Sequence, residues 1–471
     1  MQIRWLAACV VAALFASAAH AAEPAKAPTL HSRFKVLQQD FQTGPEVTKA
    51  CLACHKDASK QLHKTQHWKW EYVNQAGQLL GKRHIVNNFC TSTASNLAAC
   101  ASCHIGYGMK DAKTFDFTSE VNVDCLVCHD TTGRYTKPSG LAGNVLAKDT
   151  ELLPGSGKVV KGIDLRRIAQ SVGRSSRASC GSCHFLGGGG DGVKHGDLDS
   201  SMEAPDMELD VHMDTKGLNF SCASCHRTVN HDVPGSRYGP MGVTLTCNSC
   251  HGGAPHASKD INRHTAKLAC QTCHIPTFAR GGVPTKMSWD WSTAGQRGPD
   301  GKPLVKRDKD GYETYNGMKG DFTWAQNVVP EYAWFNGTIR YTLARDKIDP
   351  SKGPVQINRF EGSPNDGKSK IWPVKVFRAK QAWDPVNKTL AVTHLAGNDA
   401  TAYWTNLDWV KAVTTGMAAV GAPFSGQVGF IDTVSTWPIT HMVAPKAKAL
   451  ACTACHTENG RMSKVPGVSP D

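Results

Sequence analysis

Residues 51–55 read CLACH and residues 100–104 read CASCH, and they are the first two of eight C-x-x-C-H units in a chain of 471 residues. At the frequencies of cysteine and histidine in this sequence, about 0.03 such units would arise by chance. Eight units are therefore not accidental. Numbered 1 to 8 in chain order, these motifs are Cys51/Cys54/His55, Cys100/Cys103/His104, Cys125/Cys128/His129, Cys180/Cys183/His184, Cys222/Cys225/His226, Cys247/Cys250/His251, Cys270/Cys273/His274 and Cys452/Cys455/His456.

The C-x-x-C-H spacing is typical of c-type haem attachment, in which two thiols bond to one haem and the histidine binds its iron. Zinc is the main alternative for paired C-x-x-C units, but it requires units to combine and does not explain a histidine after every pair. A disulfide scaffold fits less well, because C-x-x-C is typically a redox spacing. The sequence therefore predicts eight covalently bound c-type haems, each with its motif histidine as proximal iron ligand.

The first 22 residues have the pattern of a secretory signal peptide. Arg4 supplies a basic start, residues 5–19 are apolar, and Ala19-His20-Ala21 is a small-x-small cleavage site. An uncleaved N-terminal anchor is the alternative. The sequence predicts an exported, periplasmic protein whose mature chain begins near Ala22.

The motifs are unevenly spread along the mature chain. Seven lie between residues 51 and 274, which leaves only roughly 32 residues for each haem and no room for an ordinary apolar core around each one. We expect packed haems to form much of the core. This predicts a haem-rich region at 23–274 and a second region at 275–471 that closes with motif 8.

The predicted fold class is mainly α with extensive coil, a multihaem cytochrome c fold organised around packed haems with a minor β hairpin. Short helices are expected near the motifs, for example at 46–72. Residues 275–325 are rich in Gly, Pro, Lys and Asp, which predicts long surface loops. Alternation around Asn336-Gly337 predicts a hairpin at 331–341.

Two further patterns lie in the second region. Residues 371–379 and 388–394 are candidate strands. Residues 400–420 carry apolar side chains at helical spacing, with Asp399 as a candidate N-cap and Gly421 as a stop.

Taken alone, the formal net charge of +13 favours nucleic-acid or membrane binding. Eight haems, however, bring about 16 propionate charges of opposite sign, so many Lys and Arg side chains are expected to pair with propionates. We expect no nucleic-acid partner.

The free histidines bear on whether any haem is catalytic. A haem with two histidine ligands transfers electrons, whereas one without a strong sixth ligand can bind substrate. Outside the motifs and the signal peptide, enough histidines remain to fill every site, so their number alone does not decide. They are His31, His63, His67, His84, His195, His212, His231, His256, His264, His394 and His441.

Two features are not explained by electron transfer alone. Cys90 is the only cysteine of the mature chain outside a motif, and it is either a reactive thiol or a buried inert one. Residues 187–197 combine six glycines, the first four of them consecutive, with Lys194 and His195. Glycine permits close approach to a flat macrocycle, and a neutral lysine can bind iron; a surface loop is the alternative interpretation.

The chain resembles the octahaem tetrathionate reductases, relatives of hydroxylamine oxidoreductase and the multihaem nitrite reductases. The resemblance covers nearly the whole mature chain, and every motif ends in His, unlike the C-x-x-C-K motif typical of pentahaem nitrite reductases. It is carried by residues 44–55 (GPEVTKACLACH), 67–70 (HWKW), 87–90 (NNFC), 183–199 (CHFLGGGGDGVKHGDLD), 263–281 (RHTAKLACQTCHIPTFARG) and 437–456 (WPITHMVAPKAKALACTACH).

The resemblance implies a catalytic haem at motif 2, with His104 as proximal ligand, Lys194 as distal ligand and Cys90 close by. The other seven haems would have two histidine ligands, although His31 can replace one member of the distal set. The expected distal ligands are His67, His195, His212, His231, His256, His264 and His441.

The implied activity is reduction of tetrathionate to thiosulfate, with nitrite or hydroxylamine as further substrates. The expected partners are a periplasmic or membrane-associated electron donor, a cytochrome or quinol dehydrogenase, and a small inorganic anion; an oligomer is compatible with the sequence. The alternatives are a pure electron-transfer cytochrome and a hydroxylamine or hydrazine oxidoreductase.

Overall fold

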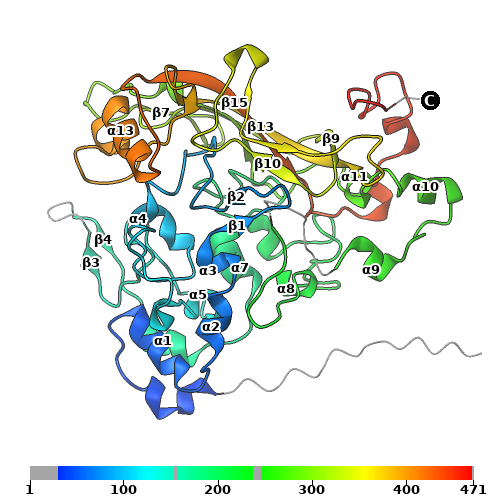
Figure 1. The fold of residues 1–471 in the computed structure, drawn as a ribbon. Helices are drawn as coiled ribbons and strands as arrows, with labels where there is room; N and C mark the ends of the chain where they lie inside the picture. Colours follow the sequence, from blue (N-terminus) through cyan, green and yellow to red (C-terminus); the bar gives the residue numbers. More distant parts are fainter. Residues whose placement is uncertain (1–29, 153–156, 237–244, 469–471) are drawn as a thin grey trace, which may run out of the picture.

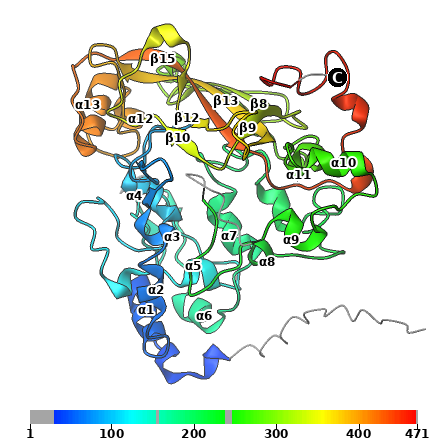
Figure 2. The same cartoon turned by 45° about the vertical axis from the view of Figure 1, so that its right-hand side comes forward.

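The computed structural model describes residues 30–152, 157–236 and 245–468. The predicted signal peptide lies outside this range. Figures 1 and 2 show short helices and coil in the motif-rich part of the chain, and a large twisted sheet that covers one side of them. Among the described residues, no helix is long and apolar enough to cross a membrane.

Each motif lies in or beside a short helical segment, and one helical turn brings residues three apart onto the same face. Several of these helices begin at side-chain caps, as at Thr43, Ser176, Ser221 and Thr246. The segments are α1 (Gly44–Leu52), α4 (Leu97–Cys100) with η3 (Ala101–Cys103), α5 (Leu126–His129), α7 (Arg177–His184), α8 (Cys222–Cys225), α9 (Cys247–His251), α11 (Cys270–His274) and η9 (Cys452–Ala454).

Further helices and two small ribbons complete the motif-rich part and the C-terminal third. The helices are α2 (Ala58–Leu62), α3 (Gln66–Lys69), α6 (Leu165–Gln170), α10 (Lys259–His264), α12 (Tyr403–Asn406) and α13 (Trp409–Ala419). The ribbons pair β1 (Tyr72–Val73) with β2 (Leu79–Leu80) and β3 (Thr150–Glu151) with β4 (Val159–Val160).

The large sheet has nine strands in the order β11-β15-β13-β5-β8-β7-β6, with β9 and β14 also paired to β13. Its centre is the long antiparallel pair of β13 and β15, in which Val374 lies opposite Pro438 and Trp383 opposite Gly429. Its strands are β5 (Thr285–Asp290), β6 (Val305–Arg307), β7 (Glu313–Asn316), β8 (Gly320–Ala325), β9 (Glu331–Phe335), β11 (Val355–Gln356), β13 (Lys370–Asp384), β14 (Thr389–Leu390) and β15 (Gly429–Pro438).

The largest apolar cluster lies on the sheet. It contains Trp289, Phe322, Phe377 and Trp437, all buried, and it extends to Phe89 from the motif-rich part. Burial of aromatic side chains of this size is a major source of stability. The sheet therefore forms the wall against which the segment before motif 2 packs.

The predicted fold class is confirmed, but the sheet is larger than one hairpin. The prediction of loops at 275–325 is wrong, because β5, β6, β7 and β8 lie there. Strands form in 331–341, yet β9 pairs with β13, and β10 (Ile339–Tyr341) pairs with β12 (Asn358–Phe360). A turn signal thus located the strand ends but not their partners, because long-range pairing is not visible in local sequence.

The strands predicted at 371–379 and 388–394 are present as β13 and β14. The helix predicted at 400–420 is interrupted at Leu407, whose φ is 56°, and Asp408 rather than Asp399 caps α13. Gly421 does end this segment, with a φ of 62°. The short helices expected at 46–72 are present as α1, α2 and α3.

The two regions are joined by hydrogen bonds. Asn74 Nδ2 donates to the carbonyl of Ile339 at 2.8 Å, and Leu268 forms a bridge with Ile371. The division at residue 274 coincides with the change from helices to sheet and stays a prediction.

Candidate functional site

Seven of the eight motif histidines lie opposite a second histidine. The ring centres of each pair are 5.9–6.4 Å apart. The pairs are His55 with His31, His184 with His67, His129 with His231, His251 with His212, His226 with His441, His274 with His256 and His456 with His264.

This separation fits a haem iron between two imidazoles. Two metal–nitrogen bonds of about 2.0 Å, plus about 1 Å from each nitrogen to its ring centre, give about 6 Å between centres. The partners come from distant parts of the chain, so one local structural feature cannot account for the repetition. The residues therefore fit seven haems with two histidine ligands each.

The hydrogen bonds of these rings agree with that interpretation. In six of them Nδ1 contacts an acceptor, which leaves Nε2 for a metal; such a contact fixes the orientation of a ligating histidine. The six are His129 to Gly173, His226 to Pro234, His231 to Gln61, His256 to Asn262, His264 to Asp260 and His441 to Asp197.

The structure brings His31, rather than His195, opposite a motif histidine. The ring of His195 packs edge-on against Trp437, at 5.7 Å between centres, and His31 lies opposite His55. His31 stands just before the first motif, and spacing along the chain does not reveal that this segment folds back. We therefore replace His195 by His31 as the predicted ligand.

Replacing His31 with alanine is expected to give a high-spin signal from one haem, because the haem of motif 1 loses its second imidazole. Electron paramagnetic resonance of the oxidised holoprotein measures this. His195→Ala is the matched control and should leave that spectrum unchanged. A high-spin haem in His195→Ala, with none in His31→Ala, would restore the original assignment.

Six motif thiols are exposed rather than buried, namely Cys54, Cys128, Cys225, Cys247, Cys250 and Cys452. Protein atoms alone therefore do not cover the sulfur at these positions. Haem binding by these cysteines stays a prediction from their motifs.

Contacts between motif cysteines give the spatial order of the motifs. Sulfur atoms are in direct contact between motifs 1 and 3, 2 and 4, 4 and 5, and 6 and 7. Cysteines of motifs 3 and 4, 5 and 6, and 7 and 8 are also near neighbours, and Cys250 is the motif 6 member that approaches Cys225. The motifs thus follow the order 1-3-4-5-6-7-8, with motif 2 branching from motif 4. This arrangement suits electron transfer along a chain of adjacent haems to a side position.

Motif 2, which occupies this side position, differs from the other seven motifs. His104 is fully buried, and its ring lies against Trp68 and Trp70 at 5.4 and 5.0 Å rather than against a second histidine. Its Nε2 is 2.7 Å from the carbonyl of Trp68, and its Nδ1 has no hydrogen-bond partner among the described residues. Burial lowers the pKa of His104 to about 3. The ring therefore lies as a neutral imidazole in an aromatic enclosure, and its role as proximal ligand stays a prediction.

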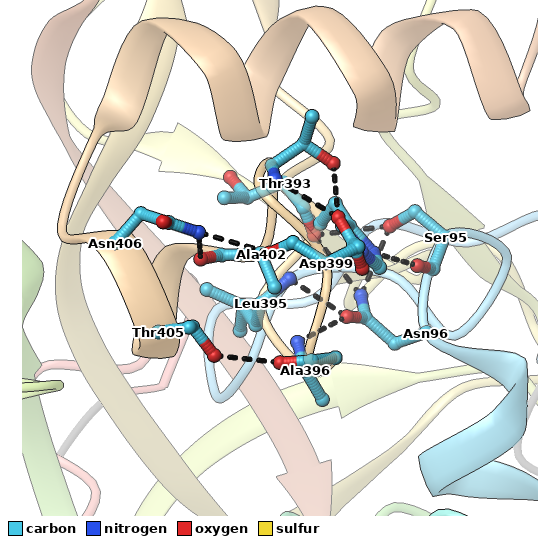
Figure 3. A network of polar contacts seen from close by, with 12 residues as sticks. Ser95, Asn96, Thr393, Leu395, Ala396, Asp399, Ala402, Thr405 and Asn406 are labelled. Atoms are coloured by element: carbon cyan, nitrogen blue, oxygen red, sulfur yellow. Dashed lines mark hydrogen bonds and ion pairs between the residues drawn. The ribbon is translucent and has the colours of Figure 1, made fainter.

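A polar network anchors the helix of motif 2 (Figure 3). The Asn96 side chain, at the start of α4, accepts hydrogen bonds from Leu395 and Ala396 and donates to the carbonyl of Thr393. Ser95 donates to the same carbonyl. The segment before Cys100 is thereby fixed to residues 393–396 of the C-terminal region.

The glycine-rich segment at 187–197, here termed the lysine loop, folds over Phe89 and Cys90. Gly188 and Gly189 have φ of +83° and +94°, and a Cβ on Gly188 would lie only 2.9 Å from Val193. Glycine is thus required for this close approach. Lys194 Nζ lies 4.1 Å from the ring centre of Trp437 and 5.9 Å from that of Phe89.

Cys90 lies beside the same loop. Its sulfur is 3.7 Å from the carbonyl of Gly188, and Cys100 of motif 2 is a near neighbour. Burial raises the pKa of the Cys90 thiol, while the positive charges of Lys319, Lys286 and Lys194 oppose that rise. The structure therefore brings Cys90, Lys194 and motif 2 together, as expected from the sequence; their chemical roles stay predictions.

Lys375 holds the lysine loop in place. This side chain on β13 is fully buried, and its ammonium donates to the carbonyls of Val193 and Lys194, at 3.0 and 3.1 Å, and to Thr285. Three acceptors match the three donors of a charged lysine. Burial lowers the pKa of Lys375 well below its usual value, and the charge of Asp197 counteracts this.

Lys286, Lys319 and Lys375 were not identified from the sequence. Each is an isolated lysine in a strand or turn, and no motif surrounds them. Only the sheet, which pairs strands far apart in the chain, brings them near Cys90.

Comparisons with known proteins agree with these features. A family model described as "Cytochrome c bacterial" matches residues 286–459, and one described as "Cytochrome c554 and c-prime" matches residues 49–130. An uncharacterized protein of Archaeoglobus fulgidus is 24% identical over 42% of this chain and 78% of its own length. The crystal structure of an octaheme cytochrome c from Shewanella oneidensis is 42% identical, with a TM-score of 0.83, and the match covers 94% of this chain and 97% of that one.

Proposed function

Since this chain belongs to the octahaem c-type cytochromes, we propose that it carries eight haems and works as a periplasmic reductase, with tetrathionate as its main substrate. Reduction would take place at motif 2. The main support for this proposal is that His104 is the one motif histidine that does not lie opposite a second described histidine. In addition, Lys194 and Cys90 lie close to each other beside motif 2. Nitrite and hydroxylamine are further candidate substrates.

The haems supply electrons when bound. Motifs 1 and 8 lie at the two ends of the spatial order, so either end offers an entry for electrons from a periplasmic or membrane-associated donor. The signal peptide predicted at residues 1–22 supports export to that compartment.

The reduction of tetrathionate can be written as a balanced reaction in which residues of this chain take part. The Cys90 thiolate attacks an inner sulfur of tetrathionate, which breaks the central sulfur–sulfur bond, releases one thiosulfate and leaves the second bonded to Cys90. Two electrons then break the bond to Cys90 and release the second thiosulfate. Throughout, Lys194 Nζ–H donates hydrogen bonds to the substrate, and Trp437 and Phe89 exclude water.

Turnover of reduced methyl viologen by the purified holoprotein tests this function, with tetrathionate, nitrite and hydroxylamine in parallel. We expect the highest kcat/KM for tetrathionate. Cys90→Ser should reduce tetrathionate turnover by about 10²-fold or more, because a hydroxyl is a far weaker nucleophile, and should affect nitrite turnover little.

Two other outcomes of these assays would contradict the proposal. Unchanged tetrathionate turnover in Cys90→Ser would exclude Cys90 from the reaction. Failure of all three substrates, in a protein whose haems are all reduced by dithionite, would identify an electron-transfer cytochrome instead.

A further inference from the structure

Lys286 is a buried lysine enclosed by aromatic rings. Its side chain is 5% exposed, and Nζ lies 3.4 Å from the ring centre of Phe322, 4.0 Å from Trp289 and 4.8 Å from Trp324. A bulge in β5 between Lys286 and Ser288 shifts the register against β8 and allows this arrangement. Aromatic faces attract an ammonium, whereas burial lowers the pKa of Lys286 to about 7, so an anion bound beside it would favour its charged form.

Across the described ranges, no carboxylate forms an ion pair with Lys286 or with its neighbour Lys319. Glu313 is nearby, but its oxygens bind Arg307 at 3.0 Å and Asn316 at 3.1 Å. Lys319 Nζ instead lies 5.7 Å from the ring of Trp404. Close like charges without counter-charges are costly away from water, and an anion bound between Lys286 and Lys319 would offset that cost.

The position of that anion follows from Cys90. Cys90 packs against the aromatic cluster that contains Trp289 and Phe322, and Trp324 and Trp404 border the same cluster. The positive charges of Lys286, Lys319 and Lys194 all act on Cys90. The first two lysines belong to the part of the chain that forms the sheet, and the third belongs to the lysine loop.

We propose that Lys286 and Lys319 form an oxyanion subsite beside Cys90, which binds one sulfonate end of a dianionic sulfur compound. The other end, with its reacting sulfur–sulfur bond, then extends toward Cys90 and Lys194. This inference rests on the proposed function. It also explains selectivity, since a small monoanion such as nitrite cannot span both groups of lysines.

A haem propionate is the competing occupant of this positive site. The two cases differ in accessibility, because a propionate is covalently part of the protein and would prevent a free anion from binding. Sulfate discriminates between them, since it resembles the sulfonate end and is not reduced.

The test is calorimetric titration of sulfate into the oxidised holoprotein at constant ionic strength. We expect Lys286→Met and Lys319→Met each to weaken sulfate binding by about 10-fold or more, as expected for loss of a charged hydrogen bond. Lys286→Arg should retain most of the affinity. Lys306→Met is the matched control, because Lys306 also lies over a ring, that of Tyr315 at 5.5 Å, but on exposed β6.

Haem content and circular dichroism establish whether each variant is folded. If Lys286→Met does not fold, Lys319→Met, whose position is only half-buried, still tests the subsite. Failure of the wild type to bind sulfate, or equal affinity in all variants, would overturn the subsite. If Lys286→Met shifts the reduction potential of a haem but leaves the sulfate affinity unchanged, the anion beside Lys286 is a haem propionate.

Tetrathionate turnover of the same samples separates the two proposals. Lysine-dependent sulfate binding without turnover would retain the subsite and reject the reductase. Turnover with an unchanged KM in Lys286→Met would retain the reductase and reject the subsite.

Discussion

Lys194→Leu is expected to lower kcat/KM for tetrathionate by about 10²–10³-fold, the usual effect of removing one hydrogen-bond donor aimed at developing charge. The chain offers few alternatives, because His104 faces tryptophans, whereas Lys194 lies over Trp437 and beside Cys90, a near neighbour of Cys100 in motif 2. Leucine retains the volume of the side chain but donates no hydrogen bond or proton. Steady-state kinetics with reduced methyl viologen measures the loss.

Lys267→Leu is the matched control for this variant. Lys267 Nζ also lies over a tryptophan ring, that of Trp334 at 5.9 Å, and donates to the carbonyl of Pro364, far along the chain from motif 2. It should keep wild-type kinetics. Wild-type kcat/KM in Lys194→Leu would remove Lys194 from the reaction, and a parallel loss in both variants would indicate general damage.

The dependence of this loop on Lys375 shows how the sheet serves the site. The ammonium of Lys375 fixes the carbonyls of the two peptide units on either side of the Lys194 Cα, and Thr285 also accepts a hydrogen bond from it while donating to Gly192. The backbone that carries Lys194 is thus held by β13 and β5. Precise placement of a catalytic group requires such support.

The motifs were predictable because covalent chemistry requires a local spacing. Two thiols and a histidine must reach one haem, and C-x-x-C-H in a helical turn meets that requirement wherever it occurs. Lys194 and Cys90 were identified through a family resemblance together with the glycines around Lys194. The Cys90 sulfur contacts the Gly188 carbonyl of the loop that carries Lys194, and the roles of both residues stay predictions.

The rest depends on contacts between distant segments. Residues 275–325 have the composition of loops, yet Trp289, Tyr315 and Phe322 are buried in the strands β5, β7 and β8, and β5 pairs both with β8 and with the distant β13. Likewise, His31 and His195 are equally plausible ligands by composition. Only the folded backbone places one opposite His55 and the other against Trp437.

Lys137→Met is expected to destabilise the protein by about 3–5 kcal/mol, the usual cost of leaving one member of a buried ion pair without its partner. Lys137 Nζ lies 2.8 Å from Asp124 Oδ2, with side-chain exposures of 3% and 0%. The hydroxyls of Tyr107 and Tyr135 both donate to the other oxygen of Asp124 at 2.8 Å. Methionine fills the space of the lysine but leaves the carboxylate charge uncompensated. Urea unfolding followed by circular dichroism measures the loss.

Lys161→Met is the control, because Lys161 pairs with Asp149 at 2.6 Å with side chains 81% and 51% exposed, and its loss should not be measurable. If the buried charge is the cause, the double variant Asp124→Asn/Lys137→Met should recover part of the stability. Equal unfolding midpoints for Lys137→Met and Lys161→Met would contradict the expectation. Since Lys137 also donates to the carbonyl of His104 at 2.6 Å, the same ion pair that stabilises motifs 2 and 3 fixes the backbone of the proposed catalytic histidine ligand.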